Sequence, residues 1–223
     1  MSALRAFLTP QRPGSWLLLG LVAVGTGGCL YNPVYRLQVS DFETTYQPRV
    51  HVFAVAPIIT LSTQPEAAKA GQAIRRAIYS QMVKRQKEYT TAIQDIAETD
   101  RLLRDEGLTD SAAAALPPSQ ACSILGVDAV MRVRLTYYAE YGVFEQIVSQ
   151  ILSDSATSVE VSADVAAYDC TDGALISEGA VERSGGMFDS VDQVHDGVGA
   201  EIASGFPYTT ERRDHYNKKK KQS

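Results

Sequence analysis

The second half of the chain contains three segments in which apolar and polar residues alternate. The apolar positions of residues 127–138 are Val127, Ala129, Met131, Val133 and Leu135. Such alternation is typical of a strand with one buried face. Residues 157–169 repeat the pattern, and residues 174–183 follow after the turn residues 170–173. We therefore expect the last two segments to form an antiparallel hairpin.

The first half of the chain predicts buried strands that alternate with helices. Residues 50–57 form a short apolar run closed by proline, which is typical of a buried strand. Residues 64–87 carry apolar residues at helical spacing, and residues 89–93 can form a second strand. Two shorter helices are expected at residues 95–106 and 117–125.

A last helix completes the predicted fold. Asp189 is expected to cap it, and one face carries Val191, Val194, Val198 and Ile202. Residues 184–186 are expected to be a flexible link before this helix. The predicted order of elements is β-α-β-α-α-β-β-β-α, which favours an α/β (α+β) fold with a mixed sheet packed by helices in a single domain.

The N-terminal residues 1–28 have the layout of a secretory signal peptide, with two arginines, an apolar stretch at residues 16–24 and small residues before Cys29. The apolar stretch is shorter than the roughly 20 residues of a membrane-spanning helix. The sequence Thr26-Gly27-Gly28-Cys29 resembles the lipobox of bacterial lipoproteins, which implies that Cys29 carries acyl chains that anchor the protein to a membrane. Leu30 at the next position implies the outer membrane. The alternative is an ordinary cleaved signal that leaves Cys29 as a free thiol.

The remaining residues divide into three predicted segments. Residues 29–49 contain two prolines and no regular pattern, so we expect a tether between lipid and domain. Residues 50–207 contain the predicted strands and helices. Residues 208–223 are charged and end in a run of lysines. We expect them to form a disordered basic tail, which is either solvated or in contact with anionic headgroups or glycan.

Composition and charge narrow the class of partners. The chain has 223 residues, of which 45% are hydrophobic and 21% charged, as in ordinary globular domains. Residues 30–210 contain 13 Lys and Arg against 24 Asp and Glu. Because nucleic-acid binding requires a basic face, this acidic body argues against a nucleic-acid partner. The bases on the helix at residues 64–87 form either a solvated face or a self-association surface; they are Arg75, Arg76, Lys84, Arg85 and Lys87.

Several short motifs between residues 101 and 181 carry a family resemblance. They are residues 106–112 (EGLTDSA), Pro117-Pro118, residues 126–130 (GVDAV) and residues 168–179 around Asp172-Gly173. With these motifs the chain resembles a family of small bacterial outer-membrane lipoproteins of the GNA type, which are often encoded beside CsgG-like lipoproteins. The resemblance implies an anticodon-binding-like fold, similar to CsgG, LpoB and the N-terminal domain of TolB. Those relatives act as secretion pores, envelope scaffolds or activators of wall synthesis, without a catalytic site in this domain.

The chain departs from that family at residues 139–155. Five apolar residues there recur at helical spacing, which predicts an amphipathic helix between two paired strands; they are Phe144, Ile147, Val148, Ile151 and Leu152. The segment is too short for two membrane-spanning strands of a barrel. The helix is expected to pack on its own domain, to form a partner or self-association surface, or to contact a membrane.

The sequence offers no arrangement typical of catalysis. Nucleophilic catalysis needs a base beside the nucleophile, whereas His51, His195 and His215 fall singly on separate predicted elements. No phosphate-binding glycine motif occurs, so we expect a protein that is not an enzyme and has no cofactor or small-molecule substrate. One acidic group near residue 190 includes His195 and could in principle bind a metal, but acids in a first helical turn more simply complement the helix dipole. We therefore expect no metal.

Cys122 and Cys170 remain as candidates for a disulfide. Cys122 precedes the strand predicted at residues 127–138, and Cys170 follows the strand at residues 157–169. If these two strands are antiparallel neighbours, both cysteines lie at one edge of the sheet. An exported protein sits where disulfides persist. A disulfide and two separate thiols both remain open.

These features together predict a non-enzymatic, lipid-anchored outer-membrane protein that faces the periplasm. We expect it to bind other envelope proteins as a scaffold or accessory subunit of a CsgG-like secretion or surface assembly, with homo-oligomers as a further option. The alternative function is a regulator that docks on a cell-wall synthesis enzyme in the manner of LpoB.

Overall fold

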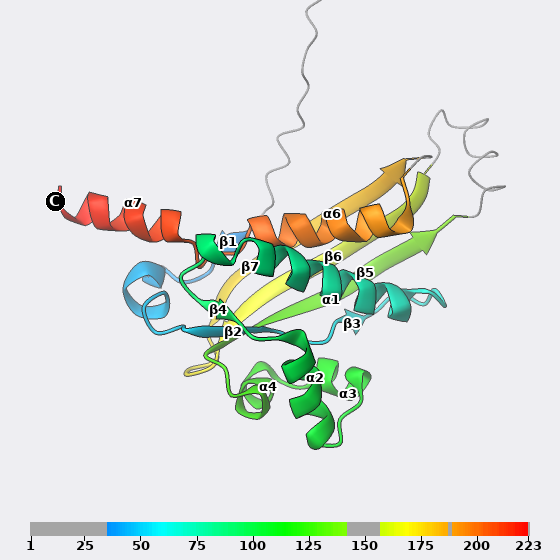
Figure 1. Cartoon of the computed structure of the whole chain (residues 1–223), viewed down its shortest axis with the longest axis horizontal. Coiled ribbons are helices and arrows are strands. Elements are labelled where there is room, and N and C mark those ends of the chain that lie inside the picture. Colours follow the sequence, from blue (N-terminus) through cyan, green and yellow to red (C-terminus); the bar gives the residue numbers. More distant parts are fainter. Residues whose placement is uncertain (1–34, 142–156, 187–188, 223) are drawn as a thin grey trace, which may run out of the picture. The chain divides into compact units, whose positions relative to one another are not determined.

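A mixed sheet organises the chain in the computed structural model, which describes residues 35–141, 157–186 and 189–222 (Figure 1). Within these residues seven strands are ordered β1-β7-β6-β5-β2-β4, and β3 also pairs with β5. The strands are β1 (Arg36–Leu37), β2 (Val52–Val55), β3 (Ile59–Thr60), β4 (Ala92–Ile93), β5 (Ala129–Glu140), β6 (Thr157–Asp169) and β7 (Leu175–Gly186).

Three long antiparallel strands form the centre of this sheet. In register, Val133 of β5 faces Val165 of β6, and Val165 faces Gly179 of β7. The turn between β6 and β7 contains Gly173, whose φ of 72° is the left-handed conformation that glycine adopts without strain. β2, β3 and β4 add parallel pairings on the other side of β5. The predicted hairpin and the predicted mixed sheet are therefore confirmed.

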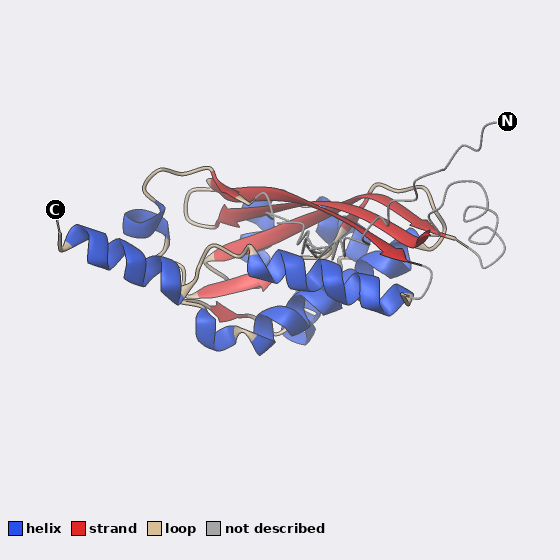
Figure 2. Ribbon diagram, turned by 90° about the horizontal axis from the view of Figure 1, so that it is seen from above, coloured by secondary structure: helices blue, strands red, loops and turns tan. Residues whose placement is uncertain are grey.

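Most of the helices lie on the two faces of the sheet, and the last one extends away from it (Figures 1 and 2). They are α1 (Ala67–Lys84), α2 (Ile96–Asp105), α3 (Asp110–Ala115), α4 (Pro118–Leu125), α6 (Val191–Ser204) and α7 (Thr210–Lys220). α1 and α6 run side by side and cover the inward residues of β5, β6 and β7. α2, α3 and α4 lie on the opposite face, over β2, β3 and β5.

The close contact of α1 and α6 depends on one glycine. A Cβ atom on Gly199 would lie 2.6 Å from the carbonyl carbon of Ala77 and 2.8 Å from the amide nitrogen of Ile78. Both are backbone atoms of α1, which cannot move without displacing the helix. Only glycine fits at this position, so Gly199 is the residue that lets the two helices pack this closely.

A cluster of aromatic rings closes one end of the main core. The ring centroid of Phe53 on β2 lies 4.7 Å from that of Phe206 and 5.9 Å from that of Tyr208. Tyr208 also packs edge-on against Phe42, with centroids 5.0 Å apart. All four side chains are at most 2% exposed. Segments far apart in the sequence therefore meet in this cluster.

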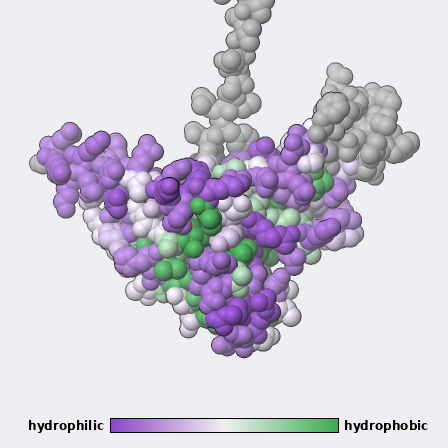
Figure 3. Space-filling model, viewed as in Figure 1, coloured by the Kyte–Doolittle hydropathy of each residue, from purple (hydrophilic) through white to green (hydrophobic). Residues whose placement is uncertain are grey.

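Two predicted segment boundaries are corrected by the structure. The tether expected at residues 29–49 is in part folded, because β1 pairs with β7 and Phe42 is fully buried. The tail expected to be disordered from residue 208 begins with fully buried Tyr208 and continues as α7. α7 has no buried residue, and its surface in Figure 3 is hydrophilic. The segment is therefore helical and not disordered, and Thr209 caps the helix by accepting a hydrogen bond from the Arg212 amide.

Smaller differences concern caps and links. Ser190, and not Asp189, caps α6, in a reciprocal pair of hydrogen bonds with Gln193. Asp189 instead accepts a hydrogen bond from the amide of Gly186. Residues 184–186 continue β7, so they are not the flexible link that we expected. α3 was not predicted as a helix, whereas α1, α2 and α4 lie where the sequence predicted helices.

Candidate functional site

Two sets of predicted site residues lie outside the described part of the chain. One is Cys29, the predicted lipidation site. The other is the predicted interaction surface, made of Phe144, Ile147, Val148, Ile151 and Leu152. Ala139 and Glu140, which we placed at the start of the amphipathic segment, are the last residues of β5.

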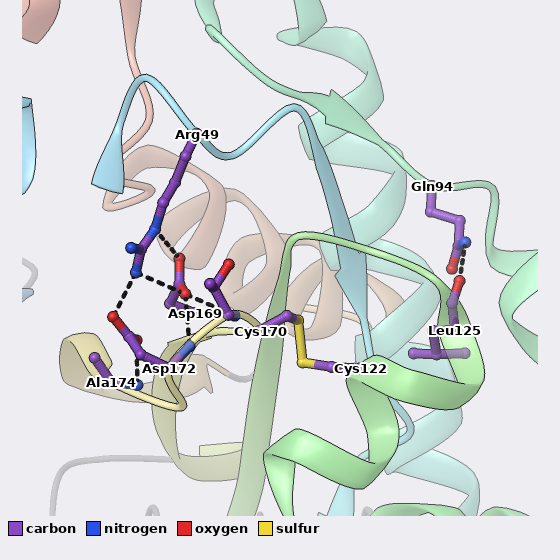
Figure 4. The surroundings of a disulfide bond; sticks show 9 residues. Arg49, Gln94, Cys122, Leu125, Asp169, Cys170, Asp172 and Ala174 are labelled. Carbon is purple, nitrogen blue, oxygen red and sulfur yellow. Dashed lines mark hydrogen bonds and ion pairs between the residues drawn. A yellow bond between two sulfur atoms is a disulfide. The ribbon is translucent and has the colours of Figure 1, made fainter. Parts of the chain in front are cut away.

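Cys122 and Cys170 are brought together in a disulfide, with Cα atoms 5.5 Å apart (Figure 4). Cys122 lies on α4 and Cys170 directly follows β6. The amide of Cys170 donates a hydrogen bond to the carbonyl oxygen of Asp128, at 2.8 Å, which holds the end of β6 beside the start of β5. The disulfide therefore fastens α4, and the small core beneath it, to the sheet.

An ionic corner lies beside the disulfide (Figure 4). Arg49 donates from Nε to Asp169 Oδ2 at 3.0 Å, and from Nη2 to Asp172 Oδ2 at 2.6 Å. The Asp169 side chain has no exposed surface, and Asp172 is 43% exposed. The hydrogen bond from Arg49 lowers the pKa of Asp172 below its ordinary value. Sequence reasoning placed Arg49 in the tether and missed this corner, because no local pattern links it to the hairpin turn.

The motif at residues 126–130 has a structural explanation. Gly126 ends α4 in the left-handed conformation, with a φ of 61°. The Asp128 carboxylate accepts hydrogen bonds from the amides of His51, at 2.8 Å, and Val52, at 2.9 Å. These bonds fix the start of β2 beside β5. The motif thus positions strands, which accounts for it without a ligand.

Arg75 corrects the interpretation of α1 as a solvated basic helix. Its side chain is only 7% exposed. Nε and Nη2 each donate to the carbonyl oxygen of Val55 at 3.1 Å, and Nη1 lies 2.5 Å from Asp100 Oδ1. Arg75 therefore links α1 to β2 and α2 inside the protein and is not available for self-association.

The face of β6, β7 and β1 that points away from α1 and α6 is not covered by any of the described helices; we call it the open face. The side chains that point away from α1 and α6 include Asp164 and Ala166 on β6 and Glu178 and Ala180 on β7, all of them exposed or half-buried. They line a shallow depression of about 620 Å³, together with Arg36, Arg132, Arg134 and Tyr168. No residue of α2, α3 or α4 lines it, so none of the described helices covers this depression.

The charges of this open face are only partly paired. Arg134 forms an ion pair with Asp164 at 3.1 Å, and Glu178 accepts a hydrogen bond from Gln38 Nε2 at 2.9 Å. Arg132 donates from Nη2 to the carbonyl oxygen of Ala114 on α3. Burial lowers the pKa of Arg132, and the nearby charge of Arg134 lowers it further. Arg132 is thus a partly buried arginine whose hydrogen-bond partner is a neutral carbonyl oxygen.

Metal chemistry has no support in the described residues. Within them, no three His, Cys, Asp or Glu side chains are grouped so that they could hold a metal ion. His195 is only 5% exposed and packs against the ring of Tyr138, with centroids 6.0 Å apart. Among the described helices, none is long and apolar enough to cross a bilayer.

Solved structures with a similar chain path come from bacterial proteins. Lipoprotein GNA1162 from Neisseria meningitidis is 18% identical, with a TM-score of 0.45 over 62% of this chain and 84% of that chain. PelC from Paraburkholderia phytofirmans, described as a dodecamer, is 13% identical, with a TM-score of 0.41 over 71% and 89%. The C-terminal domain of LpoB from Salmonella enterica is 10% identical, with a TM-score of 0.38 over 60% and 83%. No family model and no curated protein matches the chain.

Proposed function

We propose that this chain is a lipid-anchored protein of the bacterial outer membrane that binds other envelope proteins and catalyses no reaction. In this proposal Cys29 carries the acyl chains, and the folded residues face the periplasm. The chain acts as a scaffold or accessory subunit of a CsgG-like secretion or surface assembly, as its resemblance to the GNA-type lipoproteins implies.

The open sheet face is the observation that carries the proposal. Its depression of about 620 Å³ is lined by charged side chains and by Tyr168, Ala166 and Ala180. A charged sheet face of this kind suits a protein partner, because complementary charges across an interface give specificity and orientation on contact. Nothing in its chemistry supplies a nucleophile with a base.

The disulfide supports a location in the periplasm. A cystine between Cys122 and Cys170 persists in an oxidising environment such as the periplasm and is rare in the cytosol. Because Cys122 lies on α4, the packing of the small core beneath that helix depends on an oxidising environment. The disulfide in the fold therefore agrees with export of the chain to the periplasm.

The short distance between anchor and fold weighs against the LpoB-like alternative. β1 begins at Arg36, only seven residues after Cys29. Seven extended residues span at most about 25 Å. A regulator that reaches a distant wall enzyme needs a longer connection, so assembly close to the membrane is favoured.

Two measurements on the full chain test the proposal. Membrane fractionation should place the wild-type protein with outer membranes and should move a Cys29→Ala variant to the soluble periplasmic fraction. Light scattering of the lipidated protein in mild detergent should give the mass of a closed homo-oligomer or of a complex with a second lipoprotein. A Cys29→Ala variant that remains with the membranes refutes the anchor, and a lone monomer favours transient docking instead.

A further inference from the structure

A row of four residues crosses the open sheet face. In register, Arg132 of β5 faces Ala166 of β6, Ala166 faces Glu178 of β7, and Glu178 faces Arg36 of β1. Neighbouring strands lie about 4.8 Å apart, so the two arginines at the ends of the row are separated by about 14 Å. The row begins and ends with a positively charged arginine, and the two residues between them are a small one, Ala166, and a negatively charged one, Glu178.

The arginines of the row lack ionic partners in the described structure. Arg132 binds a neutral carbonyl oxygen, that of Ala114, and no carboxylate of the described residues lies within ion-pair distance of it or of Arg36. Glu178 faces Arg36 across the strands but is hydrogen-bonded to Gln38. The depression is lined by three arginines and two acids, Asp164 and Glu178, whereas residues 30–210 contain 13 bases and 24 acids. Its excess of positive charge favours a carboxylate as the bound group.

The floor of the depression is low enough for a second backbone. Ala166, Gly179 and Ala180 line it with little or no side chain, and the larger side chains of Arg132, Arg134 and Tyr168 also line it. An extended segment advances about 3.3 Å per residue and turns every second side chain to the same side. Two acidic residues four positions apart are therefore about 13 Å apart on one side of the segment, which matches the spacing of the two arginines.

We infer that this depression binds an extended acidic segment of a partner protein, in which carboxylates four residues apart pair with Arg132 and Arg36. The inference rests on the proposed function and names the chemistry of the partner. The residue between the two acids faces Ala166 and Glu178, so it is small or a hydrogen-bond donor such as serine or threonine. An anionic bilayer fits the surface less well, because it cannot enter a depression and is repelled by the acidic body.

The test uses the lipidated mature chain in detergent and two fluorescent peptides. One peptide carries two glutamates separated by Thr-Ser-Thr, and the other carries lysines in place of both glutamates. Fluorescence anisotropy at low ionic strength should show binding of the glutamate peptide only. Arg132→Gln should weaken its affinity about tenfold, and Arg36→Gln should weaken it severalfold. Arg36 is exposed, so that variant reports on binding even if Arg132→Gln disturbs α3.

Arg76→Gln is the matched control. Arg76 is also an exposed arginine but lies on α1, on the other side of the sheet from the row, and its loss should change the affinity less than twofold. Equal binding of the two peptides, or equal affinity of the wild-type chain and both row variants, overturns the inference. An oligoglucuronate that binds in an Arg132-dependent way while the peptide does not bind also overturns it, in favour of a glycan. None of these results depends on membrane fractionation or on the mass of an oligomer. A failure of this inference can therefore be told apart from a failure of the proposed function.

Discussion

Arg49 Nη2 lies 2.8 Å from Asp169 Oδ1, and the Asp169 side chain is completely buried. The two residues are 120 positions apart in the sequence: Arg49 precedes β2 and Asp169 ends β6. The carboxylate also accepts hydrogen bonds from the amides of Thr171 and Asp172, at 2.8 and 3.3 Å. This ion pair therefore fastens the N-terminal segment to the β6–β7 turn.

Replacing Arg49 should destabilise the fold strongly. Arg49→Met leaves the Asp169 carboxylate buried without its cation, which costs about 3 kcal/mol of unfolding free energy. Adding Asp169→Asn should recover part of that loss, because it removes the uncompensated charge. Arg101→Met is the control: its two ion pairs, with Glu98 and Asp105, are exposed, and the loss should stay below about 1 kcal/mol. Urea unfolding measures all three, and equal losses for Arg49 and Arg101 would contradict the argument.

Removing the disulfide should destabilise the fold by a similar amount. The two cysteines are separated by 48 residues, and closing a loop of that length stabilises a fold by about 4 kcal/mol in the chain-entropy model. The double variant Cys122→Ala/Cys170→Ala should unfold at a lower urea concentration than the wild-type chain. A reductant should lower the wild-type midpoint and leave the double variant unchanged. If the reductant has no effect on the wild-type midpoint, the bond does not contribute.

The two glycines of α6 should respond oppositely to alanine. Gly199→Ala forces a Cβ atom against the backbone of α1 and should cost about 2 kcal/mol or more. At Gly197 the three atoms nearest to the new Cβ all belong to the Arg183 side chain, which is flexible and can move. Gly197→Ala should therefore be neutral or stabilise the helix by up to about 1 kcal/mol. Thermal unfolding of the two variants distinguishes the effect of close packing from that of helix propensity. Similar losses of stability in both variants would refute the packing argument.

Stability should fall on mild acidification because of His195. Burial lowers the pKa of His195, and Asp192, Glu140 and Asp196 only partly oppose this effect. The unfolded chain, with a histidine pKa of about 6.5, thus binds the proton more readily than the folded chain. The His195 contribution is complete above about pH 6.5 and is lost as the pH falls toward the lower folded pKa.

Urea midpoints at two pH values, one above and one below 6.5, test this expectation. His195→Leu should flatten the pH dependence, since leucine cannot be protonated. His215→Gln, on the exposed helix α7, should leave the slope unchanged. A slope that persists in His195→Leu would assign it to other groups.

The long elements were predictable because their burial is periodic. β5 and β6 alternate over 12 and 13 residues, and α1 repeats its buried positions along 18 residues. β1, β3 and β4 have two residues each, too few for any period to show. Tyr208 stands beside a charged segment, and its burial depends on Phe42 and Phe53, which no local pattern connects to it.

The open face was visible in the sequence only in part. Alternation along β5 placed Arg132 and Arg134 on the side opposite Val133. It could not show that Arg134 has Asp164 as a partner while Arg132 has only the carbonyl oxygen of Ala114, because both partners are supplied by other elements. For the same reason the sequence left the pairing of Cys122 and Cys170 open, and the structure places them in one bond.

The aromatic cluster at Phe53 has a consequence for how this domain folds. Phe53 is covered by Phe206 and Tyr208, which are made about 150 residues later on the ribosome. Contacts of such large sequence separation form slowly, because a long loop must close before they stabilise anything. The core around Phe53 stays open to water until Tyr208 has emerged, so folding of the domain is completed only after synthesis has passed Tyr208.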